Sequence, residues 1–214
     1  MAAFDNSNLN ERVYLYVRDR ILANVYKPGD QINYEQLIQE LGVSRTPLRD
    51  AINRLTQDGL IEVKPRSGSY VYMPNAQDIG ELYDVRKALE CQAIEAAVRR
   101  MPREELEALL LEAEEADEAI GQGNVQRFFD ADRRFHRMII ERSGNRLLAS
   151  IMETLELKIK WFGVIITKFD RPQQANDMHK RILRAMAGGD VASARQLMGE
   201  HIEEIKRYTI GDYS

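Results

Sequence analysis

Apolar side chains in the first third of the chain recur with the spacing of amphipathic helices. Residues 10–25 place apolar side chains on one face every three or four positions, and the sequence KPGD at 27–30 ends this pattern. Two shorter helices are predicted at 34–41 and from Ser44 to about residue 57, because a glycine closes each of them.

The hydrophobic period then changes from that of a helix to that of a strand. Residues 60–63 and 69–72 are short β-forming runs, and the turn-rich sequence KPRSG between them predicts a β-hairpin. Helix, short helix, three-residue turn, helix and hairpin, in this order, make up a winged helix-turn-helix. The turn contains Gly42, which can adopt the positive φ that a tight corner between helices often needs.

After residue 77 the helical period continues, with short interruptions at glycine and proline. Six helices are predicted, at residues 78–98, 103–122, 125–142, 145–168, 173–188 and 190–208. Helices joined by such short loops pack as antiparallel neighbours, so we expect an all-α bundle. The predicted fold is mainly α, with a winged helix-turn-helix domain at 1–74, a linker at 75–77 and an all-helical domain at 78–210.

The composition is that of a globular chain without membrane or secretory segments. Hydrophobic residues make up 44% and charged residues 30% of the 214 positions, which excludes an intrinsically disordered chain. No apolar run reaches the roughly 18–20 residues that a membrane span needs, and the N-terminus lacks the pattern of a secretory signal. Cys91 is the only cysteine, so an intramolecular disulfide is excluded. We expect a cytoplasmic protein with no membrane partner.

The charge pattern adds a modest indication of nucleic-acid binding. The net charge of −4 argues weakly against it, but residues 1–74 hold nine basic and nine acidic side chains, and the acidic excess lies in the remainder. Four polar side chains of the third helix share one face that begins at its N-terminus, namely Arg45, Thr46, Arg49 and Asn53. A recognition helix directs this end at base edges in the major groove, where arginine can pair with guanine.

The hairpin tip carries a second candidate contact with DNA. Arg66 supplies charge there and Gly68 allows close approach, which suits a neighbouring minor groove or the DNA backbone. The alternative is that these arginines are ordinary solvent-exposed side chains that only keep the surface soluble. The order of the elements favours DNA binding over that alternative.

These same residues carry a family resemblance. The sequences YKPGD (26–30), YEQL (34–37), LGVSRTPLRDAINRL (41–55) and GLI (59–61) resemble the DNA-binding domain of the GntR family. The resemblance covers about residues 10–73 and implies homodimers bound to short inverted repeats of double-stranded DNA. It also implies base contacts from Arg45 and Arg49, backbone contacts from Ser44, Thr46 and Arg54, and a minor-groove role for Gly68 and its neighbours.

The second half of the chain contains a candidate metal site. All three histidines lie there, and Asp132 is four residues before His136, so the two share one helix face. A helical hairpin that turns at Gly188-Gly189 could bring His179 beside His201. One carboxylate and three imidazoles suit Zn²⁺, Ni²⁺, Mn²⁺ or Fe²⁺. The alternative for each histidine is an ordinary surface or core residue, and for the aspartate a solvated charge.

A second resemblance concerns this helical region. The sequences YDVRKALE (83–90), DRRFH (132–136), SGN (143–145) and HKRILRAM (179–186), followed by His201, resemble the FCD effector domain of the FadR subgroup of GntR regulators. The resemblance implies that Asp132, His136, His179 and His201 are metal ligands. It also implies that the metal helps to hold a small carboxylate effector and that Arg86 faces the pocket.

We therefore predict a transcriptional regulator, a repressor by analogy, rather than an enzyme. A metalloenzyme is the first alternative, but the chain shows no companion general base and no motif such as HExxH. A structural zinc protein with a winged-helix docking module is the second. Zinc is the expected cofactor, a small carboxylate is the expected effector, and an isologous pair of subunits would match palindromic DNA.

Overall fold

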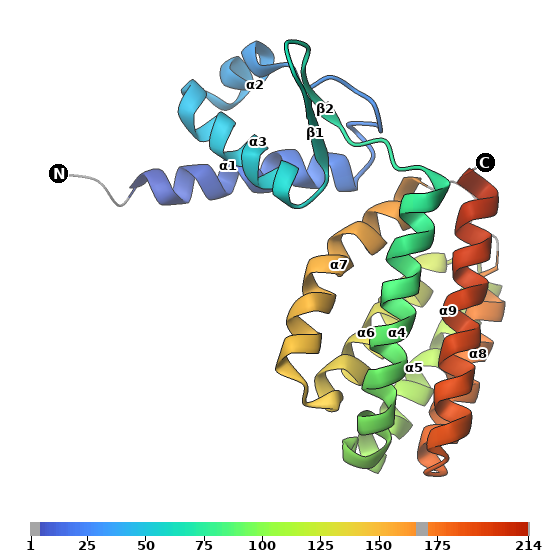
Figure 1. Cartoon of the computed structure of the whole chain (residues 1–214). Coiled ribbons are helices and arrows are strands. Elements are labelled where there is room, and N and C mark those ends of the chain that lie inside the picture. The colour runs from blue at the N-terminus through green and yellow to red at the C-terminus, as the bar shows by residue number, and fades with distance from the viewer. Residues whose placement is uncertain (1–4, 166–170, 214) are drawn as a thin grey trace. The chain divides into compact units, whose positions relative to one another are not determined.

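The computed structural model describes residues 5–165 and 171–213, and they are mainly helical as the sequence predicts (Figure 1). The elements in chain order are α1 (Asp5–Leu22), α2 (Tyr34–Leu41), α3 (Arg45–Gln57), β1 (Ile61–Lys64), β2 (Gly68–Val71), α4 (Ala76–Arg100), α5 (Arg103–Gly121), α6 (Val125–Ser143), α7 (Arg146–Ile165), α8 (Pro172–Ala187) and α9 (Val191–Tyr213). The contacts divide the chain into two compact units, one reaching from the N-terminus to Asn75 and including the end of α7 from Glu156, the other holding the remainder.

The N-terminal unit contains a winged helix-turn-helix built around one apolar core. α1 and α2 both pack against α3, and β1 lies beside the same helix. Val17, Leu37, Leu48, Ile52 and Leu55 supply this core and are almost fully buried. Gly42 closes α2 with a φ of 62°, so the corner between α2 and α3 uses the positive φ expected from the sequence.

The wing is an antiparallel hairpin, but it has more support than the sequence indicates. β1 pairs with β2 in a register that sets Ile61 opposite Val71. The segment after α1 also pairs with β2, through an isolated bridge between Gln31 and Tyr70. The amide of Ile32 donates to the carbonyl of Ser69 at 2.8 Å. This pairing anchors one side of the hairpin.

The prediction that the first helix spans 10–25 is wrong at both ends. α1 begins at Asp5 and ends at Leu22, three residues before the predicted end. Asn24 has a φ of 55°, a left-handed conformation that stops a helix. Val25 is consequently 60% exposed, although the apolar pattern assigned it to the buried face.

The second unit is an antiparallel helical bundle. α4 packs against α9 and α6, α5 packs against α6 and α8, and α8 packs against α9. Fully buried aliphatic side chains, among them Ile94, Ile139 and Ile182, fill the space between these helices. Within the described residues, no helix is long and apolar enough to cross a membrane.

Candidate functional site

The N-terminus of α3 presents polar groups that have no partner within the helix. Ser44 is the N-cap residue, with extended φ and ψ of −81° and 172°, and its side chain makes no capping hydrogen bond. The hydroxyl and the first amides of the helix are therefore available to a phosphate. Arg45, Thr46 and Arg49 follow on the exposed surface of the same turns.

The two arginines at opposite ends of α3 lie in different surroundings. Arg45 pairs with Glu35 of α2, and both side chains are largely exposed at 76% and 68%. Arg54 pairs with Glu11 of α1, and its guanidinium lies 3.8 Å from the centre of the Tyr14 ring. Arg54 thus joins α3 to α1. It has this structural role in addition to the contact with the DNA backbone that the family resemblance implies.

The tip of the wing has an unusual backbone. Arg66 is exposed and has a φ of 62°, which is rare for a residue other than glycine. Gly68 has a φ of 131°, and a Cβ atom there would lie 2.9 Å from the side-chain nitrogen of Gln31. The same nitrogen donates to the carbonyl of Ser67 at 3.1 Å. The positive φ of Gly68 therefore favours glycine at this position for reasons of local structure.

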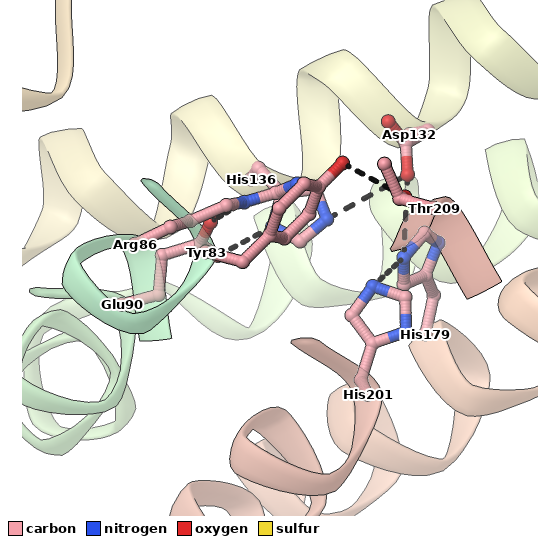
Figure 2. A network of polar contacts seen from close by, with 8 residues as sticks. All are labelled: Tyr83, Arg86, Glu90, Asp132, His136, His179, His201 and Thr209. Carbon is pink, nitrogen blue, oxygen red and sulfur yellow. Dashed lines mark hydrogen bonds and ion pairs between the residues drawn. The ribbon is translucent and has the colours of Figure 1, made fainter. Parts of the chain in front are cut away.

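The helical bundle brings the four predicted metal ligands together (Figure 2). One ligand atom from each of Asp132, His136, His179 and His201 lies within 4.8 Å of the others. Asp132 and His136 come from one face of α6, whereas His179 comes from α8 and His201 from α9. The turn at Gly188-Gly189 joins the last two helices, with a φ of 69° at the second glycine. Three helices thus contribute to one cluster.

The distances in this cluster suit a single bound cation. Nε2 of His179 lies 3.1 Å from Nε2 of His201 and 3.5 Å from Oδ1 of Asp132, which in turn is 3.6 Å from Nε2 of His136. Two ligand atoms that each lie about 2.1 Å from an ion are about 3.0–3.4 Å apart at angles of about 90–109°. Nε2 of His136 is buried and has no hydrogen-bond partner. An unshared lone pair in this position is what a metal ligand requires.

Burial keeps two of the histidines neutral. Burial lowers the pKa of His179 to about 3, against an opposing attraction from Asp132. Burial and the neighbouring His179 also hold the pKa of His201 well below its usual value. Burial opposes ionisation of Asp132, but the nearby His136 outweighs it and lowers the pKa of that carboxyl. The cluster therefore offers two neutral imidazoles and a carboxylate, which are protonation states that metal binding needs. Burial lowers the pKa of His136, but the charge of Glu90 outweighs it, so that pKa is raised and a metal would have to displace a proton there.

A buried ion pair adjoins the cluster; Arg86 was expected to face the pocket, whereas its partner Glu90 was not assigned a role from the sequence. Nε of Arg86 donates to Oε1 of Glu90 at 2.6 Å, and the side chains are 8% and 0% exposed. Oε2 of Glu90 lies 2.5 Å from Nδ1 of His136. Arg86 and Glu90 are four residues apart on α4, a spacing that marks a helical pair, but only the fold reveals that the pair meets His136.

Tyr83 and Thr209 also adjoin this network, and neither was assigned a role from the sequence. The guanidinium of Arg86 lies 5.7 Å from the centre of the Tyr83 ring. The hydroxyl of Thr209, which is buried on α9, lies 3.5 Å from that of Tyr83. Arg86 is therefore next to the cluster, as expected, but its guanidinium is already paired with a carboxylate.

A separate surface groove of about 830 Å³ is lined by residues of α4, α8 and α9. Its lining includes Lys87, Arg195 and Glu203 but neither Arg86 nor any of the four ligands. Lys87 pairs with Glu203 at 2.9 Å, so part of its charge is already compensated. This groove is therefore distinct from the buried cluster.

A winged helix-turn-helix followed by a separate helical bundle defines a class of two-domain DNA-binding regulators. Residues 9–71 match the family described as "Bacterial regulatory proteins, gntR family", and residues 81–204 match the FCD domain. The chain belongs to the GntR family and carries a C-terminal FCD domain, which confirms both resemblances. It is a transcriptional regulator and not an enzyme.

Related proteins agree with this assignment along most of the chain. The chain is 30% identical to the HTH-type transcriptional regulator YdhC of Bacillus subtilis (strain 168), over 88% of this chain and 85% of that protein. It is 24% identical to the HTH-type transcriptional repressor RspR of Escherichia coli (strain K12), over 92% and 87%. A solved GntR regulator from Rhodococcus sp. RHA1 has the same fold, with a TM-score of 0.75 at 23% identity, covering 94% of this chain and 97% of that one.

Proposed function

We propose that the protein is a cytoplasmic, homodimeric repressor whose affinity for an inverted-repeat operator is set by a small carboxylate bound beside a metal ion. Asp132, His136, His179 and His201 would hold the ion, and Zn²⁺ suits this ligand set best, with Ni²⁺, Mn²⁺ and Fe²⁺ as alternatives. Such an ion supplies a positive charge with open positions for an acid, and Arg86 lies next to it.

The observation that carries this proposal is the buried cluster of four ligand atoms with an unpartnered nitrogen on His136. A polar atom buried without a hydrogen bond costs about 1–3 kcal/mol. A cation in the cluster would remove that cost for His136 and would separate the facing nitrogens of His179 and His201. The site therefore gains more from an ion than an ordinary group of buried histidines does.

The DNA-binding part of the proposal rests on the two exposed regions of the winged helix. Arg45, Thr46 and Arg49 stand at the open end of α3, and Arg66 stands at the wing tip. The first three would read bases and backbone in the major groove, with Ser44, while Arg66 and Gly68 would approach the minor groove. Homodimeric binding follows from the twofold symmetry of an inverted repeat.

Effector control requires that the acid binds one arrangement of the DNA-reading heads more tightly than another. The repressor RspR is a relative of this chain, which supports repression as the sign of regulation. A metalloenzyme is not proposed, because the family consists of transcriptional regulators.

Thermal unfolding of metal-stripped and Zn²⁺-loaded protein, each with a panel of mono-, di- and tricarboxylic acids, tests the proposal. A ligand at 100 times its Kd adds about 2.7 kcal/mol, which is roughly 5–10 °C for a chain of this size. We expect one acid to raise the Tm of the Zn²⁺ form alone and to change its affinity for a duplex selected from a randomised pool. A Tm unaffected by Zn²⁺ contradicts the metal site, and acids that shift neither Tm nor DNA affinity contradict the effector.

A further inference from the structure

Glu90 lies between Arg86 and His136 in the polar network of the helical bundle (Figure 2). It lies on α4, its side chain is completely buried, and its two oxygens have different partners. Oε1 accepts from Arg86 at 2.6 Å, and Oε2 is 2.5 Å from Nδ1 of His136. One carboxylate therefore joins the arginine to a predicted metal ligand, although it lies outside the four-ligand cluster.

The contact with Glu90 determines how His136 is presented. A carboxylate accepts hydrogen bonds, so Nδ1 of His136 must carry the proton that this contact uses. In the neutral imidazole that a metal ligand requires, Nε2 then carries the lone pair, and it is the atom that is buried without a hydrogen-bond partner, 3.6 Å from Oδ1 of Asp132. Histidines bound to metals commonly have their second nitrogen fixed by a carboxylate in this way.

The same carboxylate compensates a cation beside the cluster. The guanidinium of Arg86 is buried, and Glu90 is the carboxylate that pairs with it. If this charge were uncompensated, it would repel a divalent ion held by the neighbouring ligands. Glu90 thus affects a bound ion in two ways. It orients His136, and it compensates the positive charge of Arg86.

We propose that Glu90 is a positioning residue of the metal centre, which presents His136 to the ion and holds Arg86 as a neutralised pair beside it. This inference rests on the proposed metal site. According to this inference, both the occupancy of the metal site and the charge pairing of Arg86 depend on the side chain of Glu90. Loss of Glu90 and loss of Arg86 therefore have opposite effects on the affinity for the ion. Without Glu90 the ion lies beside the uncompensated charge of Arg86, whereas without Arg86 that charge is absent.

The test measures the affinity of the full chain for Zn²⁺, by competition with a chromophoric chelator, and the visible spectrum of the Co²⁺ form. We expect Glu90→Gln to weaken Zn²⁺ binding by about 10–100-fold and to alter the Co²⁺ bands. We expect Arg86→Met to bind Zn²⁺ at least as tightly as the wild type. Glu105→Gln is a matched control, since Glu105 also accepts from an arginine Nε, that of Arg142, at 2.6 Å, and it is expected to leave both readouts unchanged.

The outcomes separate a positioning role from a structural one. If Glu90→Gln lowers the Tm of metal-free protein but leaves the Zn²⁺ affinity and the Co²⁺ spectrum unchanged, Glu90 is only structural and the proposal is wrong. Weaker binding by Arg86→Met contradicts the electrostatic argument. Should Glu90→Gln fail to fold, Glu90→Asp decides, because it keeps the charge but shortens the reach to His136 and must still weaken binding. A wild type that binds neither Zn²⁺ nor Co²⁺ overturns the proposed metal site itself.

Discussion

Replacement of Arg66 by glycine separates the stability of the wing from its contact with DNA. Arg66 is the third residue of a turn that the amide of Ser67 closes onto the carbonyl of Lys64 at 3.0 Å. Its φ of 62° is left-handed, which costs a residue with a side chain roughly 1–2 kcal/mol. Glycine adopts this conformation freely, and the residue before it, Pro65, already favours such a turn.

The expected change in stability is small because two effects oppose each other. Arg66→Gly removes the conformational cost of about 1–2 kcal/mol but adds roughly 0.5–1 kcal/mol of backbone freedom that folding must remove. The exposed side chain makes little packing contribution, so the free energy of unfolding should rise by less than about 1.5 kcal/mol or stay unchanged. Affinity for DNA should fall, and the slope of log K against log salt should become shallower by about one for each wing.

Fluorescence anisotropy of a labelled duplex, selected from a randomised pool, measures affinity at several salt concentrations, and urea unfolding measures stability. Asn24→Gly is the matched control, since Asn24 also has a positive φ, of 55°, but lies at the end of α1. The control should leave the affinity and the salt slope unchanged. Equal salt slopes for Arg66→Gly and the wild type would refute the assignment of Arg66 to the DNA interface.

Three other perturbations test different parts of the molecule. Arg49→Ala should reduce sequence-specific binding by about 1–3 kcal/mol in the anisotropy assay without changing the Tm, and undiminished discrimination between operator and random DNA would exclude a base contact. Arg54→Ala, in contrast, should lower the free energy of unfolding measured with urea by about 1 kcal/mol, because the variant loses the contact with the Tyr14 ring. An unaltered unfolding midpoint would contradict this. With the metal removed by a chelator, acidification should destabilise the protein, because burial lowers the pKa of His179 to about 3 in the folded state. The contribution of His179 to the free energy of unfolding is complete above pH 6.5, and it declines by up to about 1.4 kcal/mol per pH unit as the pH falls toward 3. His179→Leu should flatten this decline, and identical pH profiles for both proteins would disprove the effect.

Much of the fold could be predicted because local signals coincide with it. The hydrophobic period and the glycine and proline breaks placed α2 and α3 at their observed bounds and located the bundle helices to within five residues. The predicted end of one bundle helix at residue 168 lies outside the described residues. The pairing of Gln31 with Tyr70 was missed, because a single bridge has no period of its own. The end of α1 was misplaced because the left-handed conformation of Asn24 interrupts an apolar pattern that continues to Val25.

The candidate site was accessible from the sequence only where spacing encodes proximity. Asp132 and His136 are four residues apart, so one helix suffices to align them. Glu90 was overlooked because its contact with His136 joins α4 to α6, and no local rule relates positions 46 residues apart. Its complete burial, which distinguishes it from a solvated helix charge, is a property of the packed bundle alone.

The helical hairpin of α8 and α9 has a consequence for comparing sequences. His179 and His201 meet across a fixed separation of 22 residues, with the turn at Gly188-Gly189 between them. One residue inserted in either helix between its histidine and this turn would rotate that histidine by about 100° about its axis. A relative could then retain every histidine and still be unable to gather them. Alignments should therefore be judged on the length of this interval rather than on the number of histidines.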